Sequence, residues 1–179
     1  IKCGRDKFFK TLKQERLLVK KLKSYTITTN SYHRFNKYPN LIMDTTINRP
    51  EQVWVSDITY IRTTQGFMYL SLITDAYSKQ IMGYYLSNNM KTESTKKALT
   101  MALSNRKYPD MPLIHHSDRG FQYCHPNYTD ILDDNNVNIS MTTKYDPYEN
   151  AIAERVNGIL KQEFILDYGN FTKSEAPKI

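Results

Sequence analysis

Three acidic residues are the strongest candidates for chemistry in this sequence. Asp57 interrupts an apolar run, Asp118 ends another apolar run, and Glu154 falls on the polar side of a helix-like segment. A buried carboxylate is costly unless it is paired, hydrogen-bonded or bound to a cation. Mg²⁺ is usually held by a few carboxylates, and two such ions can activate an attacking oxygen and stabilise a leaving one in phosphoryl transfer.

The same three acids also have a purely structural interpretation. Asp57 can cap a bend, while Asp118 can pair with Arg119. Glu154 can pair with Arg155 or Lys161. Isolated acids rarely coordinate metal, so the residues alone leave both interpretations open and favour the structural one.

Other residues with possible chemistry are poorer candidates. Asp75 lies in a DAYS turn, where Asp typically bonds the backbone, so we expect it to be structural. His115 and His116 are adjacent on a strand and point to opposite faces, so they cannot share a metal ion. Cys124 and His125 lack the paired spacing of a zinc site.

Hydrophobic periodicity predicts the elements that must position these acids, in the order β-β-β-α-β-α-β-α after a short N-terminal helix. Strands are expected at 52–61, 67–78, 80–88, 112–118 and 138–142. Helices are expected at 5–15, 92–106 and 126–135, and a last one is expected to begin at Asp146.

The last predicted helix has the clearest start signal in the chain. Asp146, Pro147 and Glu149 form a variant of the capping box. An apolar stripe should pack on the body and comprises Ile152, Val156, Ile159 and Leu160. A polar face should point away from the core and comprises Asn150, Glu154, Asn157 and Lys161.

Length and charge describe one core preceded by a basic arm. The chain has 179 residues, of which 40% are apolar, enough for one main core. Residues 1–50 carry 12 Lys and Arg against 3 Asp and Glu, a net charge of +9, whereas residues 51–179 carry 13 against 15. Such an arm is typical of a protein that binds the phosphate backbone of a nucleic acid. A solvated helix face or a flexible tail explains the charge about equally well.

Composition excludes several classes of protein. The sequence contains no apolar run long enough for a membrane span and no P-loop, dinucleotide or serine-hydrolase motif. Two widely separated cysteines argue against a disulfide scaffold and are typical of a reducing cytoplasm.

Four stretches closely resemble the insertion-sequence transposases that carry a retroviral-integrase-type catalytic core. They are WVSDITYI, YLSLITDAYSKQIMGYYLS, HHSDRGFQY and MTTKYDPYENAIAERVNGILKQEF, within about residues 49–167. In that family two Asp and one Glu bind the metals. Asp57 stands at the matching first-strand position, and the 35 residues between Asp118 and Glu154 match the family spacing. The resemblance therefore implies that these three acids are catalytic and hold two Mg²⁺ ions, with Mn²⁺ as a substitute.

The resemblance also implies an architecture. We expect an α/β, RNase H-like fold, with a five-stranded mixed sheet flanked by helices. Residues 1–48 would be a basic segment, the end of a helix-turn-helix region plus a linker. Residues 49–179 would be the catalytic core, incomplete at its C-terminus. Lys144, Asn157 and Lys161 are expected to contact DNA near the scissile phosphate.

The activity implied is metal-dependent DNA cleavage followed by strand transfer, in which a freed 3′-hydroxyl attacks another phosphodiester. The implied partners are double-stranded DNA, as element ends and as target, and further copies of the chain assembled on it, with no membrane. The implied location is the bacterial cytoplasm, associated with the nucleoid. Two alternatives stay open: a related nuclease that cuts without joining, and an inactive DNA-binding remnant.

Overall fold

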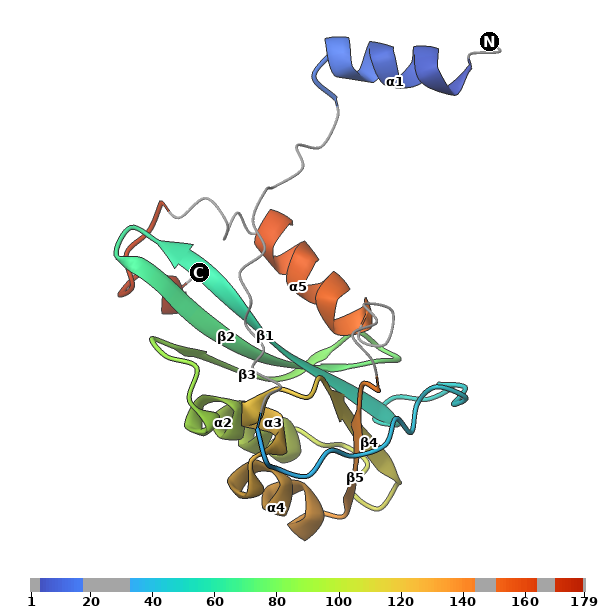
Figure 1. Cartoon of the computed structure of the whole chain (residues 1–179), viewed down its shortest axis with the longest axis vertical. Helices are drawn as coiled ribbons and strands as arrows, with labels where there is room; N and C mark the ends of the chain where they lie inside the picture. The colour runs from blue at the N-terminus through green and yellow to red at the C-terminus, as the bar shows by residue number, and fades with distance from the viewer. Residues whose placement is uncertain (1–3, 18–32, 144–150, 164–169, 179) are drawn as a thin grey trace.

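β-branched and aromatic side chains line the strands of one mixed sheet (Figure 1). The computed structural model describes residues 4–17, 33–143, 151–163 and 170–178. The strands are β1 (Val53–Thr63), β2 (Gly66–Asp75), β3 (Ile81–Ser87), β4 (Leu113–Ser117) and β5 (Val137–Met141). Their order across the sheet is β3-β2-β1-β4-β5. β1, β2 and β3 are antiparallel neighbours, while β4 pairs in parallel with both β1 and β5. The expected five-stranded mixed sheet is confirmed.

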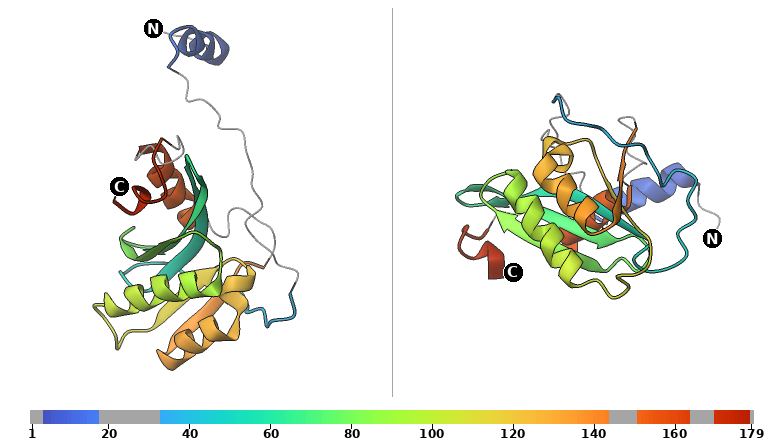
Figure 2. Two further views of the ribbon diagram at one scale, coloured as in Figure 1. Left: turned by 90° about the vertical axis from the view of Figure 1, so that its left-hand side faces the viewer. Right: turned by 90° about the horizontal axis from the view of Figure 1, so that it is seen from below.

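Helices cover both faces of this sheet. They are α2 (Thr92–Ser104), α3 (Phe121–Cys124), α4 (Pro126–Asp134) and α5 (Ala151–Glu163). The chain also contains α1 (Arg5–Gln14), in which no residue is buried, and a short 3-10 turn, η3 (Ala176–Lys178). α2, α3 and α4 pack together on one face and α5 lies on the other (Figures 1 and 2). The predicted order is confirmed, but α3 was not predicted. No helix in the described part of the chain is long and apolar enough to cross a membrane.

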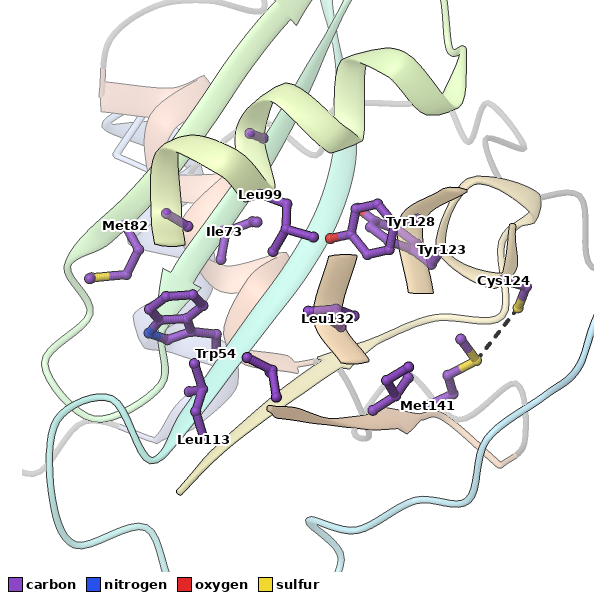
Figure 3. Close-up of a cluster of buried hydrophobic side chains, with 14 of the residues drawn as sticks. Trp54, Ile73, Met82, Leu99, Leu113, Tyr123, Cys124, Tyr128, Leu132 and Met141 are labelled. Atoms are coloured by element: carbon purple, nitrogen blue, oxygen red, sulfur yellow. Dashed lines mark hydrogen bonds between the residues drawn. The ribbon is translucent and has the colours of Figure 1, made fainter. Parts of the chain in front are cut away.

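Strand alternation divides the core between the two faces. On the α2 side, Trp54 and Ile58 of β1 pack with Leu99 of α2 and Tyr128 of α4 (Figure 3). On the α5 side, Val53 and Val55 pack with Ala153. Because successive side chains of a strand point to opposite faces, Asp57 shares the α5 side with the two valines.

The face that α5 turns toward the sheet differs from the predicted one. Val156 and Leu160 pack on the sheet as expected, but Ile159 is 38% exposed. Ala153 and Asn157 are instead buried, at 4% and 5% exposure. The small Ala153 side chain fits against β1, so the helix is rotated relative to a stripe that counts only its large apolar residues. The predicted cap residues Asp146, Pro147 and Glu149, with Asn150, lie outside the described residues.

The described part of the predicted linker is extended but is packed against the core. The Met141 N–H donates to the Pro39 carbonyl at 3.2 Å, and the Leu41 N–H donates to the Ser140 hydroxyl at 2.9 Å. Phe35 and Tyr38 pack against the buried cluster on the α2 side. Residues 39–41 therefore lie along the outer edge of β5, while the expected division of the chain at residue 48 remains a prediction.

Asp75 has the structural role expected from its turn. One carboxylate oxygen accepts hydrogen bonds from the Ser78 N–H and hydroxyl, both at 2.7 Å. The other oxygen accepts the Glu51 N–H at 2.6 Å. The residue is 1% exposed and ties the end of β2 to the start of β1.

A close contact between α2 and β3 makes Gly83 a stability determinant. A Cβ at this position would clash with the Ala98 carbonyl oxygen and lie 2.7 Å from the Ala102 nitrogen, both backbone atoms of α2. We expect Gly83→Ala to lower the free energy of unfolding by about 3 kcal/mol, because α2 must move away. Urea denaturation measures this.

The matched control is Gly158→Ala in α5, where a Cβ would meet no atom within 4 Å. Alanine favours the helix there, so this variant should be more stable by roughly 0.5–1 kcal/mol. Equal effects of the two substitutions would show that α2 does not approach β3 this closely.

Candidate active site

The parallel pairing of β1 and β4 brings two of the predicted acids together. The paired residues are Val53 with Ile114, Trp54 with His115, and Val55 with His116. Continuing that register places Asp118, the first residue after β4, opposite Asp57. The carboxyl ends of neighbouring parallel strands meet at one edge of a sheet, which is where a polar site can open.

Asp57 is held by two hydrogen bonds to its carboxylate. The Ile58 N–H donates to Oδ1 at 2.8 Å, and the Asn157 side-chain amide donates to Oδ2 at 2.6 Å. Asn157 comes from α5, so this bond joins the last described helix to the middle of β1. Within the described residues, Asn157 Oδ1 accepts no hydrogen bond although it is buried.

Asp57 carries an unusually high proton affinity. Its pKa is raised from 3.8 to about 7, chiefly by desolvation and also by the neighbouring charge of Asp118 and, to a smaller extent, of Glu154. The Ile58 and Asn157 hydrogen bonds act in the opposite direction but do not compensate. Such an uncompensated group of carboxylates attracts cations.

The loop after β4 fixes Asp118 through its own backbone. The Gly120 N–H donates to Asp118 Oδ1 at 2.9 Å. A Cβ on residue 120 would lie 2.9 Å from that same oxygen. Gly120 therefore lets the carboxylate rest against the backbone, and any side chain there displaces it.

Glu154 lies three residues before Asn157 on α5 and is exposed. Desolvation raises its pKa, and its charge is felt at Asp57, so it lies on the same side of the sheet as that residue. In the described part of the chain, no three acidic, His or Cys side chains are gathered closely enough to hold a metal ion. The structure thus places Asp57 beside Asp118, and Glu154 on the adjoining helix.

The residues predicted to contact DNA are placed differently from one another. Lys161 has its ammonium 4.0 Å from the centre of the Tyr60 ring, a cation–π contact. Asn157 faces the sheet instead of lying on an outward polar face, which corrects that part of the prediction. Lys144 lies outside the described residues. Whether any of the three contacts DNA remains a prediction.

The adjacent histidines of β4 form no shared site. His115 Nε2 lies 2.9 Å from the Tyr128 hydroxyl on the α2 side, whereas His116 Nδ1 lies 2.8 Å from the Ser140 hydroxyl. Burial lowers the pKa of His115 to about 3, so this ring is neutral. The expectation that the two rings diverge is confirmed.

The positioning roles of Asn157 and Gly120 were missed from the sequence, where Asn157 was expected to contact DNA and Gly120 was not singled out. Asn157 is one helical turn from Glu154, a spacing that puts the two side chains near one face and offered a signal. Gly120 follows Asp118 by two residues, the spacing at which a backbone N–H closes an Asx turn.

Residues 47–147 match the family described as the integrase core domain. The 31 kDa protein of insertion element IS600 from Shigella sonnei is 40% identical over 97% of this chain and 64% of its own length. The transposase of IS629 from Shigella sonnei is 39% identical over 65% of this chain and 39% of its own length. The IS3A transposase InsF of Escherichia coli K12 is 34% identical over 87% of this chain and 54% of its own length. This chain thus spans less than two thirds of these relatives.

Solved structures share the fold at low sequence identity. A simian T-cell lymphotropic virus intasome in complex with the PP2A regulatory subunit B56 gamma matches with a TM-score of 0.62 at 18% identity, over 84% of this chain and 52% of that one. The HTLV-2 integrase catalytic core domain in complex with magnesium matches with a TM-score of 0.54 at 20% identity, over 72% of this chain and 82% of that one. The expected RNase H-like fold is confirmed.

The raised pKa of Asp57 predicts an unusual pH dependence of stability. The folded state binds this proton more tightly than the unfolded state, so the free energy of unfolding should fall as pH rises from 3.8 to about 7. One pKa unit corresponds to about 1.4 kcal/mol, so Asp57 contributes a few kcal/mol to the fall. Asp57→Asn should flatten the profile, measured by chemical denaturation in EDTA.

The exposed acid Asp133 supplies the matched control. Asp133→Asn should retain the wild-type profile. A profile for Asp57→Asn as steep as that of the wild type would mean that Asp57 is solvated like an ordinary surface carboxylate.

Proposed function

Since this chain belongs to the integrase core domain family, we propose that it is the catalytic part of an insertion-sequence transposase, which cuts DNA and joins the freed end to a target. The observation that carries the proposal is the parallel register of β1 and β4, which sets Asp57 beside Asp118. The Asn157 hydrogen bond adds the helix that bears Glu154. We infer that these three carboxylates are the catalytic groups.

The donor set fits a hard divalent cation. Carboxylate oxygens are the ligands that Mg²⁺ prefers, and the charged groups that shift the pKa of Asp57 are all acids, so a bound cation would relieve their repulsion. We propose that Asp57, Asp118 and Glu154 hold two Mg²⁺ ions, which Mn²⁺ can replace. Bound there, the ions would activate the attacking oxygen and stabilise the leaving one in phosphoryl transfer.

Other residues of the chain hold the proposed catalytic carboxylates in position. Asn157 orients the Asp57 carboxylate from α5, and the Gly120 N–H orients Asp118 from the loop. Water attacks a phosphodiester at the element end and releases a 3′-hydroxyl, which then attacks a second phosphodiester. Each step replaces one P–O bond by another, so no covalent bond to the protein is required.

The proposed partners follow from this chemistry. Double-stranded DNA serves as element end and as target, and several copies of the chain assemble on it. Lys161 and Lys144 are proposed to contact the backbone near the scissile phosphate, whereas the burial of Asn157 favours its positioning role. A bacterial, nucleoid-associated location in the cytoplasm follows from the substrate.

Asp57→Asn tests the proposed function. The whole chain is incubated with labelled DNA from the ends of its insertion sequence and Mg²⁺, and cleaved and joined products are separated on gels. Removing one ligand charge should abolish both products while circular dichroism stays unchanged. Asp133 is an exposed acid of α4, and Asp133→Asn should keep wild-type activity. Wild-type cleavage without joining would favour a nuclease, and DNA binding without turnover would favour an inactive remnant.

Gly120→Ala tests the placement of Asp118 separately from its charge. The added methyl group must push the carboxylate away from its present position. A displacement of this kind should lower the rate of cleavage by about 10- to 100-fold. Stability should change little, because the atom displaced is the end of a flexible side chain. Gly158→Ala is the control, and a Gly120→Ala rate equal to that of the wild type would contradict the assigned role.

A further inference from the structure

Four aromatic rings meet beside the loop that carries Asp118. His33 and Phe35 come from the extended arm, Phe121 begins α3, and His125 lies between α3 and α4. Ring centroids are separated by 5.1 Å between Phe35 and Phe121, 5.0 Å between Phe35 and His125, and 5.5 Å between Phe121 and His125. We name these four residues the ring cluster.

Contacts lock most of the ring cluster in place while leaving one ring available. His33 Nε2 donates to the Arg119 carbonyl at 3.0 Å, and the His125 ring accepts the Asn127 N–H at 3.1 Å. Phe35 packs against the core. Phe121 is 38% exposed, although it stands only three residues after Asp118.

Positive charge flanks the ring cluster. Arg34 and Lys37 are exposed on the arm next to Phe35, and Arg119 precedes Phe121 in the loop. Burial and Asp118 raise the pKa of Cys124 to about 11, while Lys37 and Arg119 lower it, so both cations lie within electrostatic reach of α3. An exposed ring between cations suits a flat, π-bearing ligand attached to phosphates.

We propose that the ring cluster is a stacking site for an unpaired nucleobase of the DNA that the Asp57–Asp118 site cleaves. The proposal rests on the proposed function and adds a specific contact to it. Base-on-aromatic stacking contributes about 1–3 kcal/mol per base and tolerates any sequence. A paired base offers its face only to its neighbours in the duplex, so the ligand is an unpaired base at a frayed or overhanging end.

Three DNA probes separate the base from its phosphate. They are a blunt duplex, the same duplex with one unpaired terminal nucleotide, and the same duplex with an abasic nucleotide at that position. Affinity for the whole chain is measured by fluorescence anisotropy in EDTA, so the measurement does not depend on cleavage. The wild type should bind the unpaired base about tenfold more tightly than the other two probes.

Phe121→Ala and Phe121→Leu should both lose this preference, whereas Phe121→Trp should keep it. Leucine retains apolar volume without a ring, which separates stacking from packing, and thermal unfolding checks each variant. Tyr84→Ala is the matched control, because Tyr84 is a 54% exposed ring on β3. It should keep the preference.

Equal affinity of the wild type for all three probes overturns the stacking site, and so does a preference that survives in Phe121→Leu. Cleavage in Mg²⁺ is scored separately on the same DNA. A wild type that cleaves without a base preference overturns only the stacking site. A base preference lost in both Phe121→Ala and Phe121→Leu supports the site even where the wild type does not cleave, which would count against the proposed function alone.

Discussion

Two carboxylates held side by side at the end of a parallel strand pair repel one another, and the structure around them maintains that arrangement. Burial and the nearby Asp118 charge raise the pKa of Asp57 to about 7. Backbone N–H groups and one amide hold the carboxylates in place but do not neutralise them. The sheet supplies the rigidity, because β1 is paired on both sides at its first residues and cannot yield locally. The fold therefore keeps the two carboxylates close together although this raises the proton affinity of Asp57.

The rotation of α5 determines how the third acid relates to the pair. Ala153 and Asn157 face the sheet, four residues apart, so Glu154 follows directly after one buried position and precedes the other by one turn. A larger residue at 153 would push the helix outward and stretch the Asn157–Asp57 hydrogen bond. Helix packing and acid placement are thus one constraint in this fold.

The order of elements could be predicted from the sequence, because strand alternation and apolar runs depend on local pattern. The choice of Asp57, Asp118 and Glu154 as catalytic came from the family resemblance, since the residues alone favoured structural roles for them. The rotation of α5 could not be predicted, because it depends on a small residue fitting against β1 while a large one, Ile159, stays exposed. The short helix α3 has too few residues to show a period. The packing of Phe35 on the core depends on contacts with residues about ninety positions away.

The arm ties these features together. It runs along the free side of β5, where an unpaired strand edge would otherwise be exposed to other chains. The Ser140 hydroxyl accepts the Leu41 N–H and also contacts the ring of His116 on β4, two residues before Asp118 in the chain. His33 then bonds the carbonyl of Arg119, the residue after that acid. One segment therefore protects the sheet edge and braces the Asp118 loop from both sides.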